Sequence, residues 1–152
     1  MPFLLPMPEY SIRKARESDY SSICSLLNSL FPAVHMTPEK LSHRASHGAV
    51  FYLAFSPSKE LLGFVDLQMS KNTFVRGLGV SQAYRGKGIG SALLKRALKH
   101  ARGAGKQKVW LKTQATNENA IRVYSSHGFT QRKMVLGSSG EQLIVMAKET
   151  QT

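Results

Sequence analysis

A basic, glycine-rich segment in the middle of the chain constrains the fold more than any other feature. Residues 78–94 run from an apolar stretch into a turn that carries Arg85, Lys87 and three glycines, and then into residues with an apolar face of helical spacing. Glycines let the backbone approach a ligand closely. The N–H groups of a first helical turn have no partner within the helix, so they can bind an anion. The segment therefore predicts a strand, a loop and a helix that together form an anion site.

The spacing of this segment excludes the two best-known phosphate loops. A P-loop needs a glycine five residues before its Gly-Lys pair and a Ser or Thr directly after it, but Ser81 and Gly88 occupy those positions. The dinucleotide fingerprint G-x-G-x-x-G also fails, because the third glycine counted from Gly86 falls one residue early. The remaining pattern, Arg85-x-x-Gly88-x-Gly90, resembles the acetyl-CoA pyrophosphate loop of the GNAT superfamily of N-acetyltransferases.

A second motif lies about thirty residues downstream and resembles the second signature of the same superfamily. It reads Asn117-x-x-Ala120-x-x-x-Tyr124-x-x-x-Gly128-Phe129. In that superfamily this helix supplies an Asn near the pantetheine arm and a Tyr near the thioester sulfur. The spacing of Ala120 and Tyr124 places them on one face of a helix. The small Ala would leave room there for a ligand.

The order of predicted elements agrees with that family. Apolar periodicity and turn residues predict strands at 10–13, 49–55, 61–69, 73–80, 109–113, 129–136 and 143–147. They predict helices that begin after Ser18, Thr37, Gly88 and Asn117. The fold class is thus α/β (α+β mixed), with a twisted, mostly antiparallel sheet of about six to seven strands, flanked by helices and containing one parallel splayed pair. Residues 1–152 are expected to form a single N-acetyltransferase domain in which residues 1–8 are a mobile tail.

The resemblance implies a reaction and a set of site residues. Acetyl-CoA would donate its acetyl group to a primary amine, which attacks the thioester directly in a ternary complex. Strand amides would hold the acetyl carbonyl and the pantetheine, and loop amides the pyrophosphate. Tyr124 would act as the general acid, since a phenol is protonated at neutral pH. The implied cofactor-binding residues are Leu78, Gly79, Val80, Arg85, Gly86, Lys87, Gly88, Ile89, Gly90, Ser91, Asn117, Ala120 and Tyr124.

The general base is where the chain departs from the family pattern. Many members have a Glu four residues before the position of Val80, and Arg76 stands there instead. The candidate replacements, each acting through water, are Asp66, Glu118 and the histidines His35, His43 and His47. His43 and His47 have helical spacing but no acidic or cysteine partner nearby in sequence, so no metal site is expected. Cys24 is expected to be buried, and His100 to be solvated on a polar helix face.

Charge and composition bear on the partners. The net charge is +12, and between Asp66 and Glu118 there are eleven Lys or Arg and no carboxylate. Such a surface attracts polyanions, which favours an acidic protein or peptide as the acceptor, although a small amine is comparably plausible. Between the termini no apolar run approaches the length of a membrane span, about 20 residues. The single cysteine indicates a reducing compartment, so a cytoplasmic protein is expected. We also expect a monomer or homodimer, without a membrane partner.

Two other classes of function remain open at this point. Arg76 in place of the common Glu is compatible with a non-catalytic, acetyl-CoA-binding regulatory domain. The cationic interval is compatible with a basic nucleic-acid-binding domain. The second class is less favoured, because the chain has no aromatic-rich RNA platform and no helix-turn-helix signal.

Overall fold

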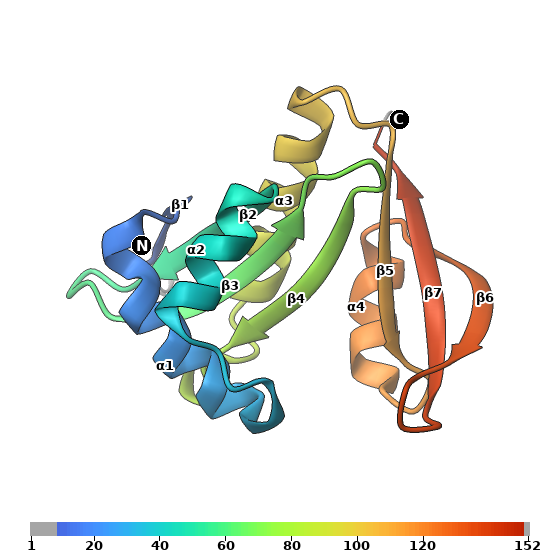
Figure 1. The fold of residues 1–152 in the computed structure, drawn as a ribbon, viewed down its shortest axis with the longest axis horizontal. Helices are drawn as coiled ribbons and strands as arrows, with labels where there is room; N and C mark the ends of the chain where they lie inside the picture. The colour runs from blue at the N-terminus through green and yellow to red at the C-terminus, as the bar shows by residue number, and fades with distance from the viewer. Residues whose placement is uncertain (1–8, 151–152) are drawn as a thin grey trace, which may run out of the picture.

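A computed structural model describes residues 9–150, which form a seven-stranded sheet with four α-helices (Figure 1). The predicted tail at 1–8 lies outside the described residues. The strand order is β1-β2-β3-β4-β5-β7-β6. The strands are β1 (Ser11–Lys14), β2 (Ala49–Phe55), β3 (Leu61–Gln68), β4 (Phe74–Val80), β5 (Lys108–Gln114), β6 (Thr130–Leu136) and β7 (Gln142–Glu149). The helices are α1 (Tyr20–Leu30), α2 (Pro38–Ser46), α3 (Ile89–Gly103) and α4 (Glu118–Ser126), with short 3₁₀ turns at Glu17–Asp19, Pro32–Val34 and Gln82–Tyr84.

The pairing of β4 with β5 determines the shape of the sheet. These two strands are parallel, whereas the other neighbouring pairs are antiparallel. They pair only at Phe74–Trp110 and Val75–Leu111, and beyond this point they diverge (Figure 1). The predicted mixed sheet with a splayed parallel pair is confirmed.

An irregularity in β4 explains the divergence. On the β3 side, Leu67 pairs with Val75 and Asp66 with Gly77, so Arg76 is an extra residue in the ladder. A bulge of this kind bends its strand and increases the local twist. The residue that replaces the common Glu therefore stands where β4 turns away from β5.

Apolar cores lie on both faces of the sheet. On one face α3 packs its fully buried Leu93, Leu94 and Ala97 against the central strands. On the other face α1 and α2 cover β2 and β3 through a core that includes Ile23, Leu41 and Phe64 (Figure 1). The same face of β5, β7 and β6 carries no helix in residues 9–150. Within this part of the chain no helix is long and apolar enough to cross a lipid bilayer.

Capping residues in the sequence predict where the helices begin, and one of these predictions is wrong. The side chains of Thr37 and Asn117 accept hydrogen bonds from the N–H groups of Lys40 and Ala120, which confirms both caps. The prediction that Ser18 is the N-cap of the first helix is wrong, because Asp19 takes that position. Ser18 lies within a 3₁₀ turn that precedes α1. The carboxylate of Asp19 accepts from the N–H of Arg16 instead, because Arg13 holds it in place through two hydrogen bonds.

Candidate active site

The end of β4 presents backbone donors toward the side that β5 has left. The Ser81 N–H donates to Leu62 O of β3 at 2.7 Å. Successive N–H groups point to opposite sides of a strand, so those of Leu78 and Val80 point away from β3. Since β4–β5 pairing ends at Val75, β5 does not take up these two donors. Both were expected to hold the acetyl carbonyl and the pantetheine.

Gly79 has a packing role. A Cβ at this position would lie 2.8 Å from Leu30 Cδ1 of α1 and 2.9 Å from the ring of Phe64. The absence of a side chain therefore lets α1 pack directly over β4. Gly79 was expected among the cofactor-binding residues, and this contact gives a separate reason for a glycine there.

The loop after β4 has the backbone geometry of an anion site. Gly86 and Gly88 have φ of 77° and 83°, and no atom lies within 4 Å of a Cβ built on either. The Gly88 carbonyl accepts the first helical bond, from Ala92 N at 3.0 Å. The N–H groups of Ile89, Gly90 and Ser91 precede it and have no partner within the helix. They point outward at the positive end of a 15-residue helix.

The two cations of the loop are anchored differently. Arg85 Nε donates to Val80 O at 3.1 Å, which ties the loop to the end of β4. The remaining guanidinium donors are still available to a ligand. Lys87 Nζ lies 5.4 Å from the centre of the Tyr84 ring. Both positive charges thus lie beside the α3 N-terminus.

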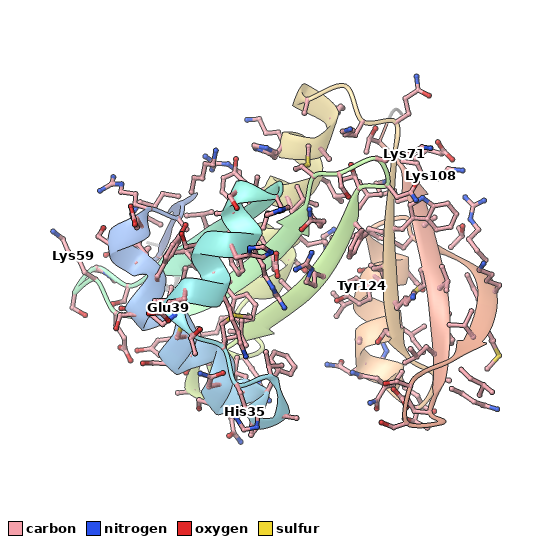
Figure 2. The ribbon with its side chains drawn as sticks, viewed as in Figure 1. His35, Glu39, Lys59, Lys71, Lys108 and Tyr124 are labelled. Atoms are coloured by element: carbon pink, nitrogen blue, oxygen red, sulfur yellow. The ribbon has the colours of Figure 1, made fainter. Side chains whose placement is uncertain are left out.

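The second motif forms α4, as expected. The Asn117 side-chain oxygen caps the helix, at 3.1 Å from Ala120 N, so only its amide nitrogen remains for a ligand. Tyr124 is half-buried and packs edge-to-face on Phe129, with ring centres 5.8 Å apart. Burial raises the pKa of its phenol, so the hydroxyl stays protonated at neutral pH. Figure 2 shows Tyr124 beside β5, on the side toward β4.

His127 is a site residue that the sequence did not reveal. Its Nε2 lies 3.0 Å from Ser91 Oγ, so it joins the first turn of α3 to the residue after α4. Burial is the main reason that its pKa is lowered. These two residues are 36 positions apart, and no local pattern marks their contact. The prediction for His100 is wrong in a similar way, because Nδ1 of that residue lies 2.8 Å from the Tyr52 hydroxyl.

Asp66 is the candidate base that the fold places beside the diverging part of β4. It lies opposite Gly77 and is 2% exposed. Burial raises its pKa to about 6, against the opposing effects of Arg76 and Arg44. Arg44 Nη1 contacts one carboxylate oxygen at 3.1 Å, and no group within residues 9–150 hydrogen-bonds to the other oxygen.

The other candidate bases lie elsewhere. Glu118 is exposed in the first turn of α4. The His43 and His47 rings stack with centres 4.2 Å apart at the end of α2, and both residues are exposed. His35 is exposed in the loop before α2, with a left-handed backbone. Among residues 9–150, no three His, Cys, Asp or Glu side chains gather closely enough to hold a metal ion.

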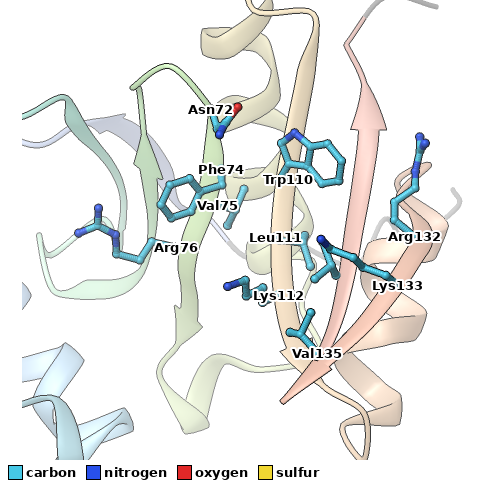
Figure 3. A pocket seen from close by; sticks show the side chains of 11 residues that line it. Asn72, Phe74, Val75, Arg76, Trp110, Leu111, Lys112, Arg132, Lys133 and Val135 are labelled. Carbon is cyan, nitrogen blue, oxygen red and sulfur yellow. The ribbon is translucent and has the colours of Figure 1, made fainter. Parts of the chain in front are cut away.

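A cavity of about 750 Å³ lies on the helix-free face of β5, β7 and β6, next to the point where β4 diverges (Figure 3). We call it the open-face groove. It is lined by Asn72, Phe74, Val75, Arg76, Trp110, Leu111, Lys112, Arg132, Lys133, Val135 and Val145. The sequence motifs do not include these residues.

Comparison with known proteins agrees with this architecture. A sequence profile of the acetyltransferase (GNAT) family matches residues 20–129, and the chain belongs to this family. An N-alpha-acetyltransferase of Sulfurisphaera tokodaii is 26% identical over 91% of this chain and 92% of its own length. An aminoglycoside N(6')-acetyltransferase type 1 of Klebsiella aerogenes is 30% identical over 79% of this chain and 89% of its own length.

Other similarities are partial or concern the fold. The mycothiol acetyltransferases of Corynebacterium share 36–43% identity with part of this chain, which spans only a quarter or less of their length. The crystal structure of the ribosomal-protein-S18-alanine N-acetyltransferase from Escherichia coli superimposes with a TM-score of 0.80. At 19% identity it covers 95% of this chain and 96% of its own, and it shows the shared fold.

Proposed function

We propose that this protein transfers an acetyl group from acetyl-CoA to a primary amine. One observation carries the proposal: β4 leaves β5 after Val75, so the amides of Leu78 and Val80 continue toward the N-terminus of α3 without a strand partner on that side. The space over Gly86 and Gly88 is open, which fits the approach of a pyrophosphate. When bound, acetyl-CoA supplies an activated thioester carbon to the acceptor.

The residues of the chain then have separate tasks. The amides of Ile89, Gly90 and Ser91, with the charges of Arg85 and Lys87, bind the pyrophosphate. The Leu78 N–H donates to the acetyl oxygen, where negative charge develops as the amine nitrogen attacks. The Tyr124 hydroxyl donates a proton to the sulfur as the carbon–sulfur bond breaks, because an alkyl thiol has a pKa near 8.5.

The proton lost by the amine needs an acceptor, and Asp66 is our proposal. A carboxyl with a pKa of about 6 is mostly ionised at neutral pH, yet it binds a proton more readily than an ordinary aspartate. In the described part of the chain, its second oxygen accepts no hydrogen bond. The sites of proton uptake and proton donation are then different residues, Asp66 on β3 and Tyr124 on α4.

Acetyl-CoA binding tests the phosphate site. Acetyl-CoA should raise the melting temperature of the wild type, because a ligand at 100 times its Kd stabilises by about 2.7 kcal/mol. Gly88→Glu should lose this shift, since the side chain and its charge enter the anion site. Gly105→Glu is the matched control, because Gly105 also has a positive φ of 79° and open space around its Cβ position. Equal shifts in both variants would remove the assignment of the loop.

Arg76 supports a second candidate function. A protein that binds acetyl-CoA without transferring the acetyl group would need no base at this position, and Arg76 occupies it at the bulge. Thiol release from acetyl-CoA over a panel of amines and peptides separates the two functions. A melting shift with no acceptor-dependent thiol release would support the regulatory domain and overturn the enzyme.

A further inference from the structure

The ionisable side chains that line the open-face groove all have the same sign of charge. The ionisable side chains that line it are Arg76, Lys112, Arg132 and Lys133, all of them cations. Glu149 lies 3.9 Å from Arg132 and offsets that charge in part. Among the described residues no ion pair forms at Lys112 or Lys133. Asp66 moderates the charge of Arg76, but Asp66 is itself paired with Arg44. The Arg76 guanidinium also donates a hydrogen bond to Gln68 Oε1. The lining therefore carries a net positive charge, mainly at Lys112 and Lys133, which attracts anions.

The groove also offers apolar contact. Phe74 and Trp110 are paired in register where β4 and β5 are still joined, and Val135 and Val145 line the far part. The Arg76 guanidinium carbon lies 5.7 Å from the centre of the Phe74 ring. Lys112 extends into the space between the strands, as Figure 3 shows. An occupant thus meets aromatic and aliphatic surface together with positive charge.

The dimensions of the groove favour an extended peptide over a single amino acid. Apart from Asn72, which precedes β4, its lining comes from β4, β5, β7 and β6, which are consecutive in the sheet. Where β4 and β5 are still paired, three spacings of about 4.8 Å between neighbouring strands give a length of about 14 Å. An extended chain rises about 3.4 Å per residue, so about four residues span the groove.

We propose that the open-face groove binds an acidic peptide in an extended conformation, and that the N-terminal amine of this peptide is the acetyl acceptor. The proposal rests on the proposed acetyl transfer. Leu78, whose amide is expected at the acetyl oxygen, is two residues beyond Arg76 on β4, or about 7 Å. A peptide amine at this end of the groove reaches the thioester carbon while its acidic side chains meet Lys112 and Lys133.

Trp110 allows a binding test that does not depend on catalysis. It is the single tryptophan of the chain and it lines the groove. We would titrate the full chain with a four-residue peptide that has a free amine and acidic residues at positions 2 to 4, and follow tryptophan fluorescence. The same peptide with glutamine at those positions is the comparison. The acidic peptide should change the fluorescence, with an affinity that falls as NaCl rises. The glutamine peptide should bind at least about tenfold more weakly.

Charge reversal on two faces locates the site. The double variant Lys112→Glu, Lys133→Glu should bind the acidic peptide at least about tenfold more weakly. It should also acetylate this peptide more slowly by a similar factor. The double variant Lys99→Glu, Arg102→Glu makes the same change in net charge at exposed positions of α3. Its affinity for the acidic peptide and its rate of acetylation should stay within about twofold of the wild type. Melting curves of the two variants, with and without acetyl-CoA, confirm that both fold and bind the donor.

Each contrary outcome has a distinct meaning. Equal binding of the two peptides, or an equal effect of the two charge reversals, would overturn the acidic-peptide groove. Free aspartate or a single-stranded oligonucleotide that binds at Trp110 more tightly than the peptide would overturn it in favour of that ligand. Peptide binding without thiol release would overturn the acetyl transfer instead, since the groove would then be occupied without turnover.

Discussion

The two sides of the β4–β5 divergence offer a ligand different chemical groups. The β4 side offers backbone N–H groups, from Leu78 through the first turn of α3, together with the charges of Arg85 and Lys87 in the loop. The β5 side offers side chains, including Tyr124 from α4 and Lys112 and Lys133 from the strands. Backbone donors are the same in every residue except proline. Backbone donors on the β4 side therefore suit a ligand part that never varies, whereas a substitution on the β5 side changes the side chains that a ligand would meet.

The largest expected effect of a single side chain is that of Tyr124. Tyr124→Phe keeps the ring that packs on Phe129 and removes the proposed acid, so kcat should fall by about 100-fold while the affinity for acetyl-CoA is kept. Steady-state thiol release measures this. Tyr84→Phe is the control on the β4 side, because its hydroxyl contacts only Glu60, at 3.3 Å, and its rate should not change. An undiminished rate in Tyr124→Phe would leave this residue a packing role only.

The next effect concerns Asp66 and pH. The folded-state pKa of about 6 lies above the ordinary 3.8, so the folded protein keeps a proton that the unfolded chain releases. The wild type should thus lose stability as pH rises from about 4 to about 6, and Asp66→Asn should not. Between pH 4 and pH 6, the free energy of unfolding of Asp66→Asn should therefore rise by about 2 kcal/mol relative to that of the wild type. Urea unfolding at pH 4, 5, 6 and 7 measures the difference.

Asp19 is a control for the direction of this pH dependence, because its pKa is shifted the opposite way. Its pKa is lowered, mainly by hydrogen bonds from Arg13. The stability that Asp19 contributes is present above its ordinary pKa and is lost as pH falls. Asp19→Asn should therefore become less stable relative to the wild type as pH rises. A difference for Asp66→Asn that stays constant with pH, or has the sign of Asp19→Asn, would contradict the buried, proton-holding carboxyl.

The smallest effect separates capping from ligand contact at Asn117. Asn117→Ala should lower the free energy of unfolding by about 1 kcal/mol through loss of the cap. Asn117→Asp keeps a good capping oxygen and removes the amide donor, so stability should be retained while the affinity for acetyl-CoA falls. Denaturation and calorimetric titration measure the two quantities. Unchanged affinity in Asn117→Asp would limit Asn117 to capping.

Local elements were the part of the fold that residues alone could predict. Thr37 and Asn117 cap their helices, and Cys24 is buried. Each depends on contacts within a few positions of the chain. Ser18 failed as a cap because Asp19 is held by Arg13 of β1, a contact that a pattern confined to the helix start does not contain.

The sequence by itself determined the glycine-rich loop between β4 and α3 and the class of fold, because glycine spacing, helix starts and strand patterns are local properties of the chain. Only the tertiary structure decided the surroundings of the proposed chemistry. Asp66 meets Arg44 from 22 positions away, Ser91 meets His127 from 36, and the open-face groove needs four strands in one register. The physical reason is that a side-chain site depends on which strands are neighbours and on the residue at which β4 turns away from β5.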